Sequence, residues 1–158
     1  NLMQPQPLLV KSFQWDPTEP AATRILMMTC WKENGGEVKE HLCFMHDSLK
    51  HVTSIFDGQQ ARRARYEYAP FGGMLTAEGD MAQSSRFRFS CEYTDDELGL
   101  VYYNYRHLNP TDGRWINRDP IAEEGELNMY SIVNNNTVSW FDILGLKFKA
   151  NQTEGTLA

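Results

Sequence analysis

Cysteine is scarce in this chain of 158 residues, which contains only Cys30, Cys43 and Cys91. The three are widely spaced and form no Cys-x-x-Cys pair, whereas a structural zinc site uses four ligands at short spacings. A chain of this length can also bury a core large enough to do without a disulfide framework. We therefore expect three buried free thiols and no structural zinc. One disulfide with a single thiol left over is the alternative.

Long apolar runs and an excess of basic residues are also missing. No run approaches the roughly 20 residues of a membrane-spanning helix, and the first residues have neither the charged start nor the apolar stretch of a signal peptide. Lys and Arg number 15 against 21 Asp and Glu, which gives a net charge of −6, whereas a nucleic-acid binder carries a basic surface patch. We expect no membrane span and no nucleic-acid partner.

Histidine does not indicate a metal site. His41, His46 and His51 are spaced by five residues, which is not the spacing of one helix face. The segment that holds them also has the pattern of strands and turns, in which histidines serve many roles besides metal binding. We expect no metal and no cofactor.

Sustained helical periodicity is absent from the first 115 residues. Strand-length segments, apolar or alternating, are separated instead by turn sequences such as Asn34-Gly35-Gly36 and Asp57-Gly58. A short helix is predicted within 121–133, after Asp119 as cap and Pro120 as first helical residue. The fold class is therefore mainly β, built from successive antiparallel hairpins, with a short helix near the C-terminus. The predicted strands cover 8–15, 24–31, 37–45, 52–56, 64–68, 86–89 and 100–106.

Four motifs follow one another in a fixed order between Leu42 and Leu146. They are YEYAPFG at 66–72, FRFSCEY at 87–93, DDELGLVYYNYRHLNPTDGRWINRDP at 95–120 and ELNMYSIVNNNTVSWFDILGL at 126–146. Together they resemble the RHS/YD-repeat family, and specifically its RHS repeat-associated core, whose closing motif is D-P-x-G-L. Asn136 and Ile143 stand where that family has proline.

The resemblance implies a fold and a partner. RHS proteins are wrapped β-sheet shells that form a hollow cage around a C-terminal cargo, often a toxin, and the core closes one end of the cage. By this comparison, residues 1–41 are an N-terminal β segment that ends a YD-repeat array, 42–146 the core and 147–158 a tail. The partner would be a cargo or toxin domain of a parent protein, in a secreted or cell-surface bacterial location.

The resemblance also implies an activity, because many cores are intramolecular aspartyl proteases that cut after the leucine of D-P-x-G-L. The matching carboxylates are Asp119 and Asp142, the cut lies between Leu146 and Lys147, and Arg106 matches an arginine implicated in some members. Two carboxylates that share one proton can act as base toward water and as acid toward the amide. The chain itself holds Asp142 near the bond, which replaces substrate binding by proximity.

Simpler interpretations of the same residues stay open. Asp119 can cap a helix, Asp142 can serve as a turn residue, and Arg106 can form a surface ion pair. The chain would then be a non-enzymatic scaffold, or a β module that binds carbohydrate or a partner protein. Its aromatic residues would form the sheet core or a platform for sugars; they are Tyr102, Tyr103, Tyr105 and Trp115. Open strand edges also favour a homodimer.

Overall fold

The computed structural model describes residues 8–19, 21–33, 36–120, 128–142, 144–146 and 148–150. Nearly all regular structure in them is antiparallel β-sheet, so the predicted mainly β class is confirmed. A six-stranded sheet contains β1 (Lys11–Trp15), β2 (Ile25–Trp31), β3 (Val38–His46), β4 (Val52–Asp57), β5 (Arg62–Tyr68) and β6 (Met74–Glu78) in that order.

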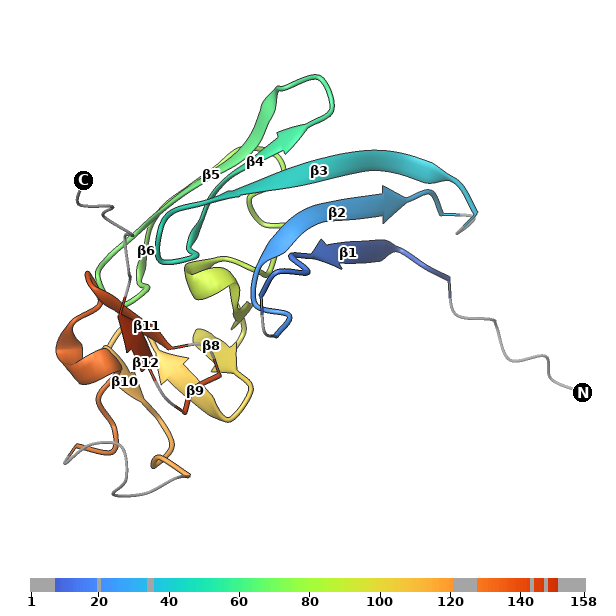
Figure 1. Ribbon diagram of the computed structural model, residues 1–158. Coiled ribbons are helices and arrows are strands. Elements are labelled where there is room, and N and C mark those ends of the chain that lie inside the picture. The colour runs from blue at the N-terminus through green and yellow to red at the C-terminus, as the bar shows by residue number, and fades with distance from the viewer. Residues whose placement is uncertain are drawn as a thin grey trace, which may run out of the picture.

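Two smaller sheets complete the described fold. The four-stranded sheet has the order β10-β9-β8-β7, with β7 at Tyr93–Asp95, β8 at Leu100–Tyr103, β9 at Arg106–Asn109 and β10 at Arg114–Trp115. The two-stranded sheet pairs β11 (Trp140–Asp142) with β12 (Phe148–Ala150). Figure 1 shows the large curved sheet above and the two small sheets gathered beneath one end of it.

Aspartates build the turns that join the middle strands of the large sheet. Asp47 and Asp57 each accept hydrogen bonds through Oδ1 from the N–H groups two and four residues further on, at 2.9–3.0 Å. This local bonding is typical of aspartate in turns. Each turn then places its fourth residue in the left-handed region, Lys50 with φ 67° and Gln60 with φ 65°. The hairpin predicted at Asp57 is therefore present, with Gln60 rather than Gly58 as the left-handed residue.

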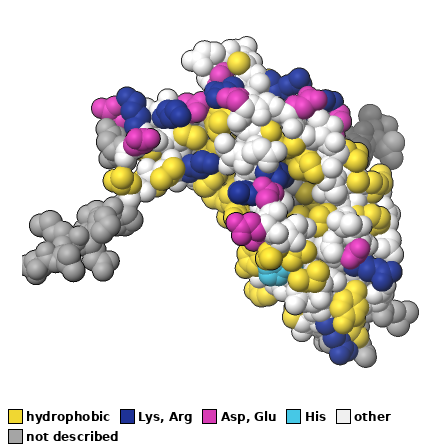
Figure 2. All heavy atoms as spheres, turned by 180° about the vertical axis from the view of Figure 1, so that it is seen from behind, with side chains coloured by type: hydrophobic (Ala, Val, Ile, Leu, Met, Phe, Trp, Pro, Cys, Tyr) yellow, Lys and Arg dark blue, Asp and Glu magenta, His cyan; other side chains and the backbone are white. Residues whose placement is uncertain are grey.

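Two hydrophobic clusters form the interior. The first lies under the large sheet and includes Leu42 and Ile55, both 0% exposed, and the second is enclosed by the small sheets around Leu108 and Trp115. Tyr68 packs against both. Full burial of one large apolar side chain stabilises a fold by roughly 1.5–3 kcal/mol. Other hydrophobic side chains remain at the surface, as the face drawn in Figure 2 shows.

Two predicted strands differ from the structure. The segment 100–106 is not one strand, because the chain reverses at Asn104-Tyr105 and Tyr103 pairs with Arg106 across a tight turn. The segment 86–89 alternates but forms only a bridge from Phe87 to Tyr93. It is followed by η1, a 3-10 turn at Phe89–Cys91 in which Ser90 has φ 52°. Left-handed residues cannot continue a ladder, which alternation alone does not reveal.

The short C-terminal helix is not shown. Residues 121–127 lie outside the described residues, and 128–132 contain no α-helix. The next regular element is η3, a 3-10 turn at Val133–Asn135. Within the described ranges, no helix has the length and apolarity needed to cross a membrane.

All three cysteines are free thiols, but they are not all buried. Cys30 and Cys91 are buried as expected, and Cys91 accepts a hydrogen bond from the N–H of Ile25 at 3.3 Å. Cys43 is exposed, because it alternates with the buried Leu42 and Phe44 along β3 and so lies on the outer face of the sheet.

Candidate functional site

Arg106 stands at the centre of the candidate site. It begins β9, directly after the tight turn from β8, and its side chain is only 5% exposed. Its guanidinium lies over the ring of Trp115 in β10, with Cζ 4.2 Å from the ring centroid. A cation this deeply buried requires partners, since desolvation of an unpaired charge costs several kcal/mol.

Those partners include the two predicted carboxylates. Nη1 of Arg106 lies 2.8 Å from Oδ2 of Asp119, and Nη2 lies 3.3 Å from Oδ2 of Asp142. The carboxylate side chains are 11% and 3% exposed. The structure therefore brings the three predicted residues together, with one guanidinium bridging two acids from distant parts of the sequence.

Asp142 also organises the segment that follows it. Its Oδ1 accepts hydrogen bonds from the N–H groups of Leu144 at 3.1 Å, Gly145 at 2.7 Å and Leu146 at 3.2 Å. One carboxylate oxygen thus folds the chain into a tight loop while the other contacts Arg106. Leu146, the residue before the predicted cut, is held to Asp142 through its own N–H. Lys147 lies outside the described residues.

Residues of the β8–β9 turn and the start of β9 also form hydrogen bonds to this loop. Nε of Arg106 donates to the carbonyl oxygen of Gly145 at 2.5 Å, and the N–H of Tyr105 donates to that of Leu144 at 3.2 Å. Gly145 has φ +76°, and a Cβ there would lie 3.1 Å from Cβ of Tyr103 and 3.3 Å from the backbone N of Arg106. Close approach and left-handed backbone together explain the glycine.

Burial alters the acidity of this region. It raises the pKa of the Asp142 carboxyl, although the N–H donors of 144–146 and Arg106 oppose the rise. Burial, and then the neighbouring Asp142 charge, raise the pKa of Glu92 to about 8, against the opposing effect of Lys50. Tyr103 is buried completely and its pKa also rises through desolvation. Desolvation therefore raises the pKa of two carboxyl groups near the loop, those of Asp142 and Glu92.

A narrow cavity adjoins Asp142. Ser90, Tyr103, Thr137 and Phe141 are among the residues that line it, and its volume is about 10 Å³. This is close to the smallest space that can hold one water molecule. The site therefore combines two acids, a bridging cation and room for a single small molecule beside one of the acids.

Sequence reasoning missed two charged residues of this region, Glu92 and Lys50. Glu92 occupies the variable position of the F-R-F-S-G-x-Y motif, so the motif carries no signal for it. Lys50 lies three residues after the turn aspartate Asp47, in a segment without a motif. Its burial is explained by the left-handed backbone at Lys50, which is known only from the structure.

Comparison with known proteins places these residues in a family context. No family model matches the chain. Toxin subunit YenC1 of Yersinia entomophaga is 31% identical over 113 residues, which are 68% of this chain and 11% of that subunit. The chain is a relative of Tc toxin subunits. Double-stranded DNA deaminase toxin A of Burkholderia cenocepacia is 44% identical over 89 residues, which are 56% of this chain and 6% of that toxin.

Solved structures that resemble this chain also come from Tc toxins. The crystal structure of TcdB2-TccC3 matches with a TM-score of 0.70 and 26% identity over 80% of this chain and 7% of its own. A Photorhabdus luminescens Tc holotoxin pore matches with a TM-score of 0.70 and 25% identity over 90% of this chain and 7% of its own. The chain thus spans about a tenth or less of the length of each of these four proteins. Together these findings support a toxin-associated RHS-type β module.

Proposed function

We propose that this chain is an RHS core that closes a β-cage around a C-terminal cargo and cuts itself after Leu146. The observation that carries the proposal is the guanidinium of Arg106, which joins Asp119, Asp142 and the carbonyl of Gly145 in one buried site. The predicted scissile bond begins at the next residue. Proximity of this kind removes the entropic cost of bringing a substrate to the site.

The reaction is hydrolysis of the Leu146–Lys147 peptide bond. Water adds to the carbonyl carbon of Leu146, the C–N bond breaks, and the nitrogen of Lys147 leaves as an amine after taking a proton. We assign the donation of that proton to Asp142, because burial raises its pKa and its side chain contacts the N–H of Leu146. Asp119 accepts a proton from the water as the water attacks, before the C–N bond breaks. Arg106 orients both acids and balances the charge that develops between them.

The role within a parent protein rests on the relatives. These relatives are toxin subunits and toxins, and each is about ten or more times as long as the segment that it shares with this chain. One related crystal structure was determined without its hypervariable C-terminal region. We infer that this module stands between an upstream β-shell, which residues 1–41 end, and a cargo or toxin domain of the parent protein, with 147–158 as the tail after the cut. An extracellular bacterial location follows from the same relatives.

Intact mass of the denatured protein tests the cleavage. We expect the wild-type chain to yield a fragment that ends at Leu146, whereas Asp119→Asn and Asp142→Asn each stay at full length. Loss of one member of a cooperating pair costs nearly as much as loss of both. Asp112→Asn, at an exposed acid of the β9–β10 turn, is the matched control and should cleave normally. A wild-type chain that remains intact from mildly acid to neutral pH would refute the protease.

One observation favours the non-enzymatic alternative. Three N–H donors already occupy Oδ1 of Asp142, as they would in a purely structural turn. In that case the module binds a partner or a carbohydrate through exposed aromatic residues. Tyr102 and Tyr105 are 42% and 59% exposed, whereas Tyr103 and Trp115 belong to the core. Uncut wild-type protein that binds an oligosaccharide array would support this function.

A further inference from the structure

Lys50 is a buried lysine that the cleavage chemistry does not use. Its side chain is only 8% exposed, although lysine is almost never fully buried unless it is paired. It is the left-handed residue of the Asp47 turn between β3 and β4, and its N–H donates to the carbonyl of Asp47 at 3.1 Å. The turn therefore fixes the direction in which the side chain leaves the backbone.

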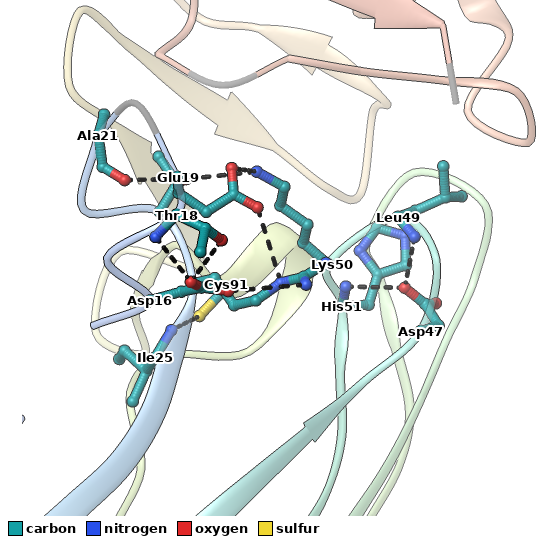
Figure 3. Close-up of polar contacts among 12 residues, drawn as sticks. Asp16, Thr18, Glu19, Ala21, Ile25, Asp47, Leu49, Lys50, His51 and Cys91 are labelled. Atoms are coloured by element: carbon teal, nitrogen blue, oxygen red, sulfur yellow. Dashed lines mark hydrogen bonds and ion pairs between the residues drawn. The ribbon is translucent and has the colours of Figure 1, made fainter. Parts of the chain in front are cut away.

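The ammonium group of Lys50 contacts two segments that are far apart in the sequence. Nζ lies 2.6 Å from Oε2 of Glu19 and donates to Oγ1 of Thr23 at 3.3 Å, both in the β1–β2 connection. Figure 3 shows the side chain reaching from its own loop to Glu19. The same Nζ lies 5.2 Å from the ring centroid of Phe141 in β11. Phe141 directly precedes Asp142.

Strand β11 is held by contacts on several sides: Trp140 packs against the second hydrophobic cluster, and its N–H donates to the carbonyl of Asn136 at 3.2 Å. Within the described chain its ladder partner is β12, whose residues Phe148–Ala150 follow the predicted cut. The partner strand of β11 therefore lies downstream of the proposed cut, in the other cleavage product. On the near side of the cut, Arg106 contacts Asp142 and Lys50 contacts the ring of Phe141.

We propose that Lys50 is a positioning residue that links the β1–β2 connection to β11, so that Asp142 takes its place only after the six-stranded sheet has formed. This inference rests on the proposed function, because it makes self-cleavage depend on the folding of an upstream segment. The contact of a desolvated ammonium with an aromatic face is strong enough for this purpose, as it is worth about a tenfold change in an equilibrium or a rate.

Two measurements test the link, one with cleavage and one without it. In the wild-type background, Lys50→Met should slow the appearance of the fragment about tenfold, and Lys50→Arg should restore most of the rate. Lys32→Met is the matched control, since Lys32 forms an ion pair of the same 2.6 Å length with Glu37 at the surface. It should cleave at the wild-type rate.

Hydrogen exchange supplies the second measurement, in the uncleaved Asp119→Asn chain. The N–H groups of 144–146 donate to Asp142, so Lys50→Met should speed their exchange about tenfold. The amides of β3 should keep their protection. Phe141→Leu should have a similar effect, and adding it to Lys50→Met should change little more, because both remove one contact.

The outcomes separate this inference from the proposed function. If the wild type cuts itself but Lys50→Met alters neither cleavage nor the exchange of 144–146, Lys50 is not a positioning residue while the protease stands. If the wild type never cuts but exchange responds as described, the link stands without the protease. Equal loss of protection in β3 would make Lys50 a general stabilising residue, and the inference would be wrong.

Discussion

At the scale of single residues, the site depends on one cation that serves several acceptors. Arg106 contacts Asp119, Asp142 and the carbonyl of Gly145 through different nitrogens of its planar group. Lysine has a single charged nitrogen and cannot reproduce such a fork. A positive charge at position 106 is therefore not enough to build the site. The planar guanidinium is also needed to position Asp119 and Asp142 relative to the loop at 144–146.

Replacement of Arg106 should show this in both stability and cleavage. Arg106→Met leaves two buried acids without their cation, and we expect a loss of about 3–5 kcal/mol in the free energy of unfolding. Arg106→Lys should lose less stability but still fail to cleave. Urea unfolding in the Asp119→Asn background measures the first effect and intact mass of the single variants the second. Arg114→Met removes an exposed arginine and should change neither; a comparable loss there would contradict the argument.

Gly145 provides a second prediction at this scale. Gly145→Ala places a Cβ against Tyr103 and Arg106 in a left-handed backbone, so we expect a loss of about 1–3 kcal/mol and slower cleavage. Gly99 also has a left-handed backbone, with φ +68°, but a Cβ there would meet open space. Gly99→Ala therefore isolates the backbone strain, about 1 kcal/mol. Thermal unfolding of both variants compares them. Equal losses would show that the close contacts at Gly145 are unimportant.

Glu92 predicts a pH dependence of stability. Its pKa rises from 4.5 to about 8 on folding, so its neutral form belongs to the folded state. The stability that this gives is present below the unfolded pKa and is lost as the pH rises toward 8. Glu92→Gln keeps the neutral group and should remove this loss, on the order of 4 kcal/mol between pH 5 and 8.5. Urea unfolding at both pH values is the measurement, and the exposed Glu97→Gln should behave as wild type.

At the scale of elements, alternation and turn residues were enough to predict most of the large sheet. Strands β1 to β5 lie within or close to predicted segments, because apolar side chains two apart bury one face. The sequence could not indicate the reversal at Asn104-Tyr105, since aromatic and polar residues alternate through it without a break. The motifs pointed to Arg106, Asp119 and Asp142. Lys50 and Glu92 matter because they are buried, and no local sequence pattern predicts that burial.

The two aspartate turns permit a matched comparison of elements. Asp47→Ala and Asp57→Ala remove equivalent pairs of hydrogen bonds to backbone N–H groups, and each should cost about 1–2 kcal/mol. Asp57→Ala also removes an ion pair with Arg63 at 3.5 Å, so it is the more demanding control for stability. Only the Asp47 turn directs Lys50 toward Phe141, so only Asp47→Ala should also slow cleavage. Thermal unfolding and the time course of fragment formation measure the two effects. Slower cleavage in both variants would point to stability alone.

At the scale of the whole molecule, the large sheet leaves β1 as an edge strand. The residues that precede it are apolar and exposed, with Leu8 at 60%, Leu9 at 47% and Val10 at 63%. Exposed apolar edges favour pairing with another chain. We predict a homodimer through this edge in light scattering, and Val10→Lys should shift it toward monomer. A wild-type monomer at high concentration would contradict this prediction.

The ladder between β11 and β12 has a consequence for how a cargo would leave. The predicted cut falls inside the connection between these strands, so breaking the peptide bond does not by itself separate the two products. After the proposed cut, the new C-terminus would remain hydrogen-bonded to Asp142, and the downstream product would remain paired with β11. Scission and release are then independent events with separate rates. In the proposed mechanism, the rate of scission would depend on the two acids. The rate of release would depend on how readily β12, a strand of three residues, dissociates from β11.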